Sequence, residues 1–173
     1  GRAAVESFLA AGATVAVNGR TAESVAAALK ELAAGERVIA APGDTATAAG
    51  CKAVVDAAVA GLGGLDVLVN NAGSGGGGPV GDLDEALWDK VVDTNLKGTF
   101  FCTKYALPAL RDGGGAIVNI ASVRAVMGAA GASIYCASKG GVVSMTKAMA
   151  IEFAPEIRVN ALLPGWTLTD QTA

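Results

Sequence analysis

Apolar residues along the chain follow two patterns, which alternate from one end of the sequence to the other. A helical spacing of three and four residues predicts helices at 2–11, 21–34, 48–60, 95–110 and 132–154, with a further helical pattern starting at Asp84. Short apolar runs between turn residues predict buried strands at 14–18, 37–41, 65–70, 116–121 and 157–162.

This alternation of helices and strands indicates an α/β fold. Strands joined through helices pair in parallel, and the helices then cover both faces of the sheet. The sequence has no internal repeat, and its glycine-rich loop at 75–78 is too short to link two domains. We therefore expect residues 1–173 to form a single domain.

Composition narrows the function classes. Apolar residues make up 52% of the chain and charged residues 17%, and the net charge of −3 offers no basic surface for nucleic acid. There is no run of about 18 apolar residues and no signal-peptide pattern, so we expect a cytoplasmic protein without a membrane span. Histidine is absent and the three cysteines are widely spaced, so no metal site is expected.

Ser122, Tyr135 and Lys139 are the candidate reactive groups. Ser122 follows the apolar run 116–121, at the carboxyl end of a strand, which is the edge where ligands bind in open α/β sheets. Tyr135 and Lys139 are four residues apart in a predicted helix and therefore share one of its faces. A hydroxyl, a phenol and an ammonium can then meet at one point.

Proton transfer to or from an alcohol oxygen is the chemistry that these three groups favour. A free phenol titrates near ~10, and lowering its pKa by ~3 units takes about 4 kcal/mol. An ammonium ~4 Å away supplies about that much at an effective dielectric constant of ~20. On its own, however, a tyrosine four residues before a lysine is a weak motif and could be incidental.

Four further motifs accompany this pair in a fixed order along the chain. They are Asn70-Asn71-Ala72-Gly73, Asn95 in Thr-Asn-Leu-Lys-Gly, Ser122, and Pro164-Gly165 followed by Thr169. With these motifs the chain resembles the short-chain dehydrogenase/reductase family, and especially its 3-oxoacyl-carrier-protein reductase-like branch. The resemblance covers essentially all 173 residues.

The resemblance implies a catalytic set of four residues. Tyr135 would be the general acid/base, and Lys139 would lower the pKa of the phenol and bind the nicotinamide ribose. Ser122 would hold the substrate oxygen, and Asn95 would join a proton relay through a water near the lysine. From the residues alone, Asn95 could equally be a helix amide that only satisfies backbone groups.

The resemblance also implies a nicotinamide-cofactor site. Besides Tyr135 and Lys139, its expected members are Gly1, Arg20, Asp44, Asn71, Ala72, Gly73, Pro164, Gly165 and Thr169. Asn71 to Gly73 could also be a plain turn, and Asp44 a cap near a helix. Thr167 stands where the family has an aliphatic residue, which weakens the expected contact with the carboxamide.

Arg20 bears on the choice of cofactor. NAD enzymes place an acid after the second strand to bind the ribose hydroxyls, whereas this chain has Asn18-Gly19-Arg20. A guanidinium fits the 2′-phosphate of NADP in charge and geometry, so we expect NADP rather than NAD. The alternative is a solvated loop arginine.

Two parts of the family fold are missing from the sequence. Only Gly1-Arg2 resembles the phosphate-binding turn that follows the first strand, and the closing C-terminal strand is absent. We therefore expect a Rossmann-like doubly wound parallel sheet with a slot between strands 14–18 and 65–70. The native molecule should then have an upstream segment that ends in a glycine-rich turn.

The resulting hypothesis is an oxidoreductase that transfers a hydride between NADP(H) and a carbonyl or secondary alcohol. A 3-oxoacyl thioester is the first substrate guess, and a sugar or cyclic alcohol is the second. A non-catalytic cofactor-binding or scaffold protein on the same fold is the rival. The complete Ser, Asn, Tyr and Lys set argues against this rival, since binding alone needs no phenolate.

A homodimer or homotetramer is also expected. The helices at 95–110 and 133–154 are apolar on more than one face, and the resemblance implies that they pair across a two-fold axis. The residues in excess of what one sheet face needs are Leu107, Leu110, Val142, Val143, Met145 and Met149.

Overall fold

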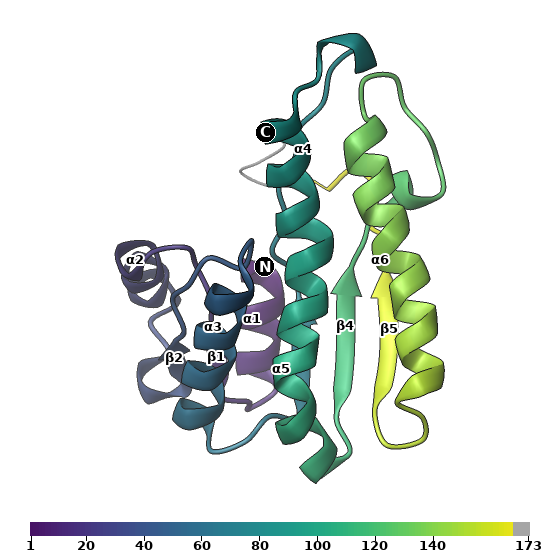
Figure 1. The fold of residues 1–173 in the computed structure, drawn as a ribbon. Helices are drawn as coiled ribbons and strands as arrows, with labels where there is room; N and C mark the ends of the chain where they lie inside the picture. The colour runs from purple at the N-terminus through teal and green to yellow at the C-terminus, as the bar shows by residue number, and fades with distance from the viewer. Residues whose placement is uncertain (168–173) are drawn as a thin grey trace.

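Helices and strands alternate along the chain in the predicted order (Figure 1). The computed structural model describes residues 1–167. The strands are β1 (Val15–Val17), β2 (Val38–Ala40), β3 (Val67–Asn70), β4 (Ala116–Ile120) and β5 (Arg158–Leu162). The helices are α1 (Arg2–Ala10), α2 (Ala22–Leu32), α3 (Ala48–Leu62), α4 (Glu85–Val92), α5 (Gly98–Gly113) and α6 (Ser133–Glu152). None of the described helices has the length and apolar character needed to cross a membrane.

Helix starts are set by side chains that accept hydrogen bonds from free backbone N–H groups. The Thr21 hydroxyl accepts from the N–H of Ser24, and the Ser24 hydroxyl accepts from the N–H of Thr21, so Thr21 caps α2 where the sequence predicted the helix to begin. Asp84 caps α4 by accepting from the N–H of Leu87 at 2.8 Å. These caps fix where each helix leaves its loop.

The helical segment from 85 to 113 is continuous, although the sequence pattern suggested two separate helices. A π-helical stretch, η3 (Asp93–Lys97), joins α4 to α5. A π turn inserts one extra residue and breaks the regular apolar spacing, which explains the apparent interruption. The stretch carries Asn95, whose side chain is buried.

All described strands pair in parallel, in two groups. β1 pairs with β2, and β3, β4 and β5 form a three-stranded sheet in that order. β1 and β3 are not hydrogen-bonded to each other, and a cavity of about 960 Å³ is lined by residues of both strands. The gap agrees with the slot expected between these two strands of a doubly wound sheet.

The helices cover both faces of the strands, as predicted (Figure 1). α3, α5 and α6 lie on the near face in this view, while α1 packs against β1 and α2 packs against β2. The main apolar core lies between the near helices and β4 and β5. It is formed by Cys51, Val55, Cys102, Ala106, Leu110, Ile117, Met149, Phe153, Ile157 and Val159.

The expected outward apolar surface on α5 and α6 is smaller than predicted. Leu110, Val142 and Met149 are buried inside this chain, and Leu107 and Met145 pack against its core. These side chains are buried because α5 packs against α3, and α6 against α4, in addition to the strands. Their apolar character is therefore no argument for a second subunit.

Candidate active site

Ser122 lies just beyond the carboxyl end of β4, as predicted. Its side chain is buried, and its hydroxyl accepts a hydrogen bond from the N–H of Arg124 at 3.2 Å. The next residue, Val123, donates its N–H to the carbonyl of Pro164 at 3.0 Å. The loop after β4 is thereby joined to the loop after β5, and the Ser122 hydroxyl keeps its proton available for donation.

Tyr135 and Lys139 lie in the first turns of α6. The Lys139 ammonium donates to the carbonyl of Ile120 at 2.7 Å, two residues before Ser122. The same nitrogen lies 5.9 Å from the centre of the Tyr135 ring. The structure therefore brings the lysine beside both the strand end that carries Ser122 and the ring of the tyrosine.

Lys139 is a buried cation. Its residue is 4% exposed, and burial lowers the pKa of the ammonium to about 8 because the charged form loses water. No acidic side chain pairs with it among the described salt bridges. Near neutral pH most of these side chains still carry the charge, so within residues 1–167 the site presents a cation without a neutralising partner.

Asn95 clamps two segments together. Its amide donates to the carbonyl of Ser74 and to the hydroxyl of Ser138, both at 3.0 Å, and accepts from the N–H of Ser74 at 2.7 Å. Ser138 in turn donates to the carbonyl of Tyr135 at 2.8 Å. The side chain thus satisfies backbone and hydroxyl groups, as the structural alternative anticipated, and it does so one residue from Lys139.

Sequence reasoning missed Ser138 and Ser74. Ser138 is directly before Lys139 and buried, so its position between the two candidate residues was the available signal. Ser74 could not be found from the sequence, because only its backbone N–H and carbonyl contact Asn95, and any residue type has these groups.

Several of the expected cofactor residues line the cavity between β1 and β3, near the carboxyl end of β3. Gly1, Asn71 and Ala72 are among its lining residues, and a Cβ on Gly1 would lie 3.1 Å from the Asn71 amide. Gly73 comes next: a Cβ there would lie 3.4 Å from Asn95 Oδ1 and 3.6 Å from Lys139 Nζ. Small residues at this point let a ligand approach backbone and lysine together.

The other expected members are more dispersed. Asp44 is exposed, and its carboxylate accepts from the N–H of Ala46 at 3.0 Å in a turn before α3, whose cap is Thr47. Pro164 is held beside Val123, and Gly165 is exposed next to it. Thr169 lies outside the described residues.

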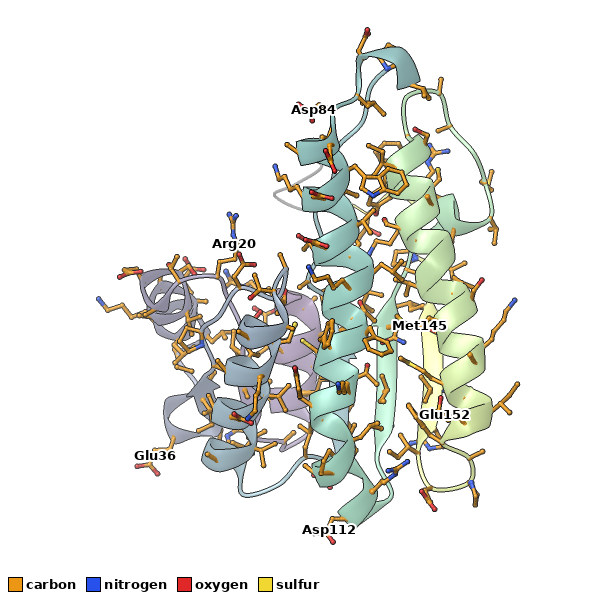
Figure 2. All side chains as sticks on the ribbon, viewed as in Figure 1. Arg20, Glu36, Asp84, Asp112, Met145 and Glu152 are labelled. Carbon is orange, nitrogen blue, oxygen red and sulfur yellow. The ribbon has the colours of Figure 1, made fainter. Side chains whose placement is uncertain are left out.

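Arg20 points into solvent. It follows β1 on the side of the molecule toward which the strands run, and Figure 2 shows its side chain directed away from the ribbon. The described salt bridges do not include it. Its forked donors are therefore available to an anion that approaches this edge.

Known proteins match most of the chain's length. The profile of the short chain dehydrogenase family matches residues 1–173. The 3-oxoacyl-acyl-carrier-protein reductase of Staphylococcus aureus is 41% identical over 165 residues, 93% of this chain and 67% of the relative. The dehydrogenase subunit BbsD of Thauera aromatica is 42% identical over 161 residues, 91% of this chain and 64% of BbsD. The chain thus spans about two thirds of each relative.

Solved structures agree with these sequence matches. A variant of the actinorhodin polyketide ketoreductase, solved with NADPH, superposes with a TM-score of 0.91 at 42% identity, over 96% of this chain and 66% of that one. An apo SCOR enzyme from Clostridium thermocellum gives a TM-score of 0.90 at 31% identity, over 98% and 69%. The chain therefore belongs to the short-chain dehydrogenase family.

Proposed function

We propose that the protein is an NADP(H)-dependent oxidoreductase that interconverts a carbonyl and a secondary alcohol. The observation that carries the proposal is the position of the buried Lys139 ammonium, bonded to Ile120 beside Ser122 and 5.9 Å from the Tyr135 ring. A scaffold or cofactor sensor has no use for an unneutralised cation next to a phenol. Burial of that cation is costly, so a catalytic purpose is the better explanation.

In the reductive direction, the Tyr135 phenol gives its proton to the substrate carbonyl oxygen. The Lys139 ammonium stabilises the negative charge that develops on the phenol oxygen as the proton leaves. The Ser122 hydroxyl donates a hydrogen bond to the same substrate oxygen and holds it in place. The hydride for the carbonyl carbon would come from a nicotinamide held at this site. In oxidation, Tyr135 takes the proton back.

Asn95 is proposed to support this set. Its bonds to Ser74 and Ser138 join the loop after β3 to α6 near Lys139. Its position on the π stretch suits a functional role, since π turns often occur at functional sites. A relay water next to the lysine would complete the proton path from Tyr135 to solvent.

NADP is the proposed cofactor. The residues that would hold it fit, since Gly1, Asn71, Ala72 and Gly73 present amide and backbone groups with little side-chain bulk at one strand edge. Arg20 would bind the 2′-phosphate and Asp44 the adenine. Pro164 and Gly165 would face the carboxamide. The similar ketoreductase solved with NADPH supports this choice.

An acyl substrate is proposed over a sugar. Val126 and Met127, which follow the turn after Ser122, are 71% and 59% exposed, and Trp166, after β5, is 87% exposed. Apolar side chains left open at this edge suit an acyl chain better than a polar ring. The 3-oxoacyl reductase among the relatives supports a 3-oxoacyl thioester.

We also propose that the protein is a homodimer or homotetramer and that it is located in the cytoplasm. Phe100 on α5 is 44% exposed and Ile151 on α6 is 81% exposed, which leaves apolar surface on both helices. The cysteines are free thiols, which supports a reducing compartment.

The test is NADPH consumption by the intact enzyme against a panel of carbonyl compounds. The proposal expects turnover with a 3-oxoacyl thioester and little or none with aldoses or cyclic ketones. NADPH binding without reduction of any panel member would favour the scaffold or sensor instead. Preference for a sugar would agree with the proposed mechanism but would contradict the proposed acyl substrate.

A further inference from the structure

Four polar side chains form a buried row across the middle of the molecule. The Asn70 amide on β3 donates to Thr103 on α5 at 3.1 Å and to Asn119 on β4 at 2.8 Å. The Asn119 amide then donates to the Thr146 hydroxyl on α6 at 2.9 Å. All four residues are at most 8% exposed, and Asn119 and Thr103 are fully buried. The row links two neighbouring strands to the helices that pack on them.

We propose that the Asn119–Thr146 hydrogen bond is a positioning device that sets where α6 lies along β4, and so where Tyr135 and Lys139 stand relative to Ser122. Asn119 and Thr146 are thus positioning residues for the reaction. This inference rests on the proposed function.

The spacing on α6 supports the proposal. Tyr135, Lys139 and Thr146 are separated by four and seven residues, which places them on one face of the helix. That face contacts β4 twice: Lys139 bonds to the Ile120 carbonyl, and Thr146 bonds to the side chain of the preceding residue, Asn119. Two consecutive strand residues therefore hold the helix at points two turns apart.

The two contacts differ in how well they can fix a position. A lysine has a long, flexible stem and can follow its acceptor if the helix slides by an ångström or two. The Asn119 and Thr146 side chains are short, and the hydroxyl is fixed further because it donates to the Val142 carbonyl at 2.7 Å. A shift of one helical residue, ~1.5 Å, would break their bond.

Because the bond is buried, it favours one alignment of α6 on β4, which apolar contacts alone would not do. Apolar contacts between helix and sheet tolerate sliding, whereas an amide buried without a partner is costly. Among the described residues, no buried side-chain nitrogen or oxygen lacks a hydrogen-bond partner. The row is therefore satisfied in one alignment of α6 on β4, and a slipped alignment would leave the Asn119 amide unpaired.

Thr146→Val and Thr103→Val form a matched pair of variants for the test. Each replaces a buried threonine by a residue of nearly the same shape, and each removes one acceptor from an asparagine amide. Only Thr146→Val removes a hydrogen bond between α6 and the sheet. Thr103 bonds α5 to β3, and the packing of α5 against α3 still holds α5 in place when that bond is lost. Thr146→Ser keeps the hydroxyl and serves as the rescue.

In the intact enzyme, Thr146→Val is expected to lower kcat for carbonyl reduction by about tenfold with little change in the KM for NADPH. Thr146→Ser and Thr103→Val should stay within about threefold of wild type, although both valine variants should melt at lower temperature. Equal kcat values for the two valine variants would overturn the proposal. If Thr146→Val does not fold, Thr146→Cys, with its weak acceptor, takes its place.

A second readout needs no turnover. Acetylation of Lys139, followed by mass spectrometry, should be slow in the wild type because the ammonium is buried and bonded. It should be several-fold faster in Thr146→Val but unchanged in Thr103→Val; equal rates would overturn the positioning role. If the wild type reduces no carbonyl, the proposed function fails, while this comparison still decides whether Thr146 positions Lys139.

Discussion

The ammonium of Lys139 and the carbonyl oxygen of Ile120 are joined by a 2.7 Å hydrogen bond. This contact attaches the helix that carries Tyr135 to the last residue of the strand that precedes Ser122. It also accounts for how a lysine can stay in the interior, since one of its three donors is satisfied by backbone. The remaining donors are left for a substrate, a cofactor or water.

Burial of Lys139 should cost stability. Its pKa is lowered from 10.5 to about 8, so the folded protein is penalised for holding the ammonium at every pH below about 8. The penalty fades as pH rises from about 8 toward 10.5, because the folded lysine is then neutral and giving up its proton costs less the closer the pH lies to 10.5. Lys139→Met should therefore stabilise the fold by roughly 2 kcal/mol at pH 7 while abolishing turnover.

Urea unfolding at pH 7 and pH 10 measures this effect, and the gain should be much smaller at pH 10. Lys147→Met is the control, because Lys147 is on the same helix but exposed. A loss of stability in Lys139→Met at pH 7 would contradict this. It would mean that the hydrogen bond of the ammonium stabilises the fold by more than burial of its charge destabilises it.

Arg20→Ala should separate the two cofactors. A charged hydrogen bond contributes ~1.5–3 kcal/mol, so binding of NADPH should weaken by ~10- to 100-fold while NADH changes little. Fluorescence titration of both cofactors gives the ratio. Lys30→Ala removes an exposed charge from the neighbouring α2 and should leave both affinities unaltered. The same loss for NADPH and NADH would exclude Arg20 as a phosphate ligand.

The sequence was informative where local chemistry decides structure. The helix start at 21, the apolar run at 116–121 and the spacing of Tyr135 and Lys139 depend on neighbours in the chain, and each element they predicted is present. The order of helices and strands then fixed a parallel α/β arrangement. From that arrangement, Ser122 could be placed at the carboxyl end of its strand.

Long-range pairings were beyond the sequence pattern. Asn95 with Ser138, and Asn119 with Thr146, are 43 and 27 residues apart, and no local spacing distinguishes such partners from surface polar residues. Leu110, Val142 and Met149 were assigned to a subunit interface because one apolar stripe seemed enough for the sheet. They are core residues because α5 and α6 also pack against neighbouring elements.

Phe100 and Ile151 provide a test of assembly. If α5 and α6 pair across a two-fold axis, the intact protein should be a dimer or tetramer by light scattering at micromolar concentration. Phe100→Glu places a charge on the exposed part of α5 and should shift it toward monomer. Wild-type protein that is already a stable monomer would contradict the pairing.

The gap between β1 and β3 should make the polypeptide of residues 1–173 weakly stable by itself. Among the described strands, none pairs with the edges of β1 and β3 that face the cavity. Each unpaired buried backbone group costs ~1–3 kcal/mol, against a typical domain stability of ~5–15 kcal/mol. Calorimetry with and without NADPH is expected to show a broad, low-temperature transition that NADPH does not move. A cooperative melt raised by micromolar NADPH would refute this expectation.

Tyr135 is the group on which the catalytic account depends most. The decisive measurement is kcat for NADPH-dependent reduction of a 3-oxoacyl thioester by wild type and by Tyr135→Phe, with Tyr105→Phe as control and NADPH binding measured in parallel. The account predicts a fall of ~10²- to 10⁴-fold for Tyr135→Phe, with cofactor binding retained and the control unaffected. A Tyr135→Phe enzyme with near-normal kcat would contradict it.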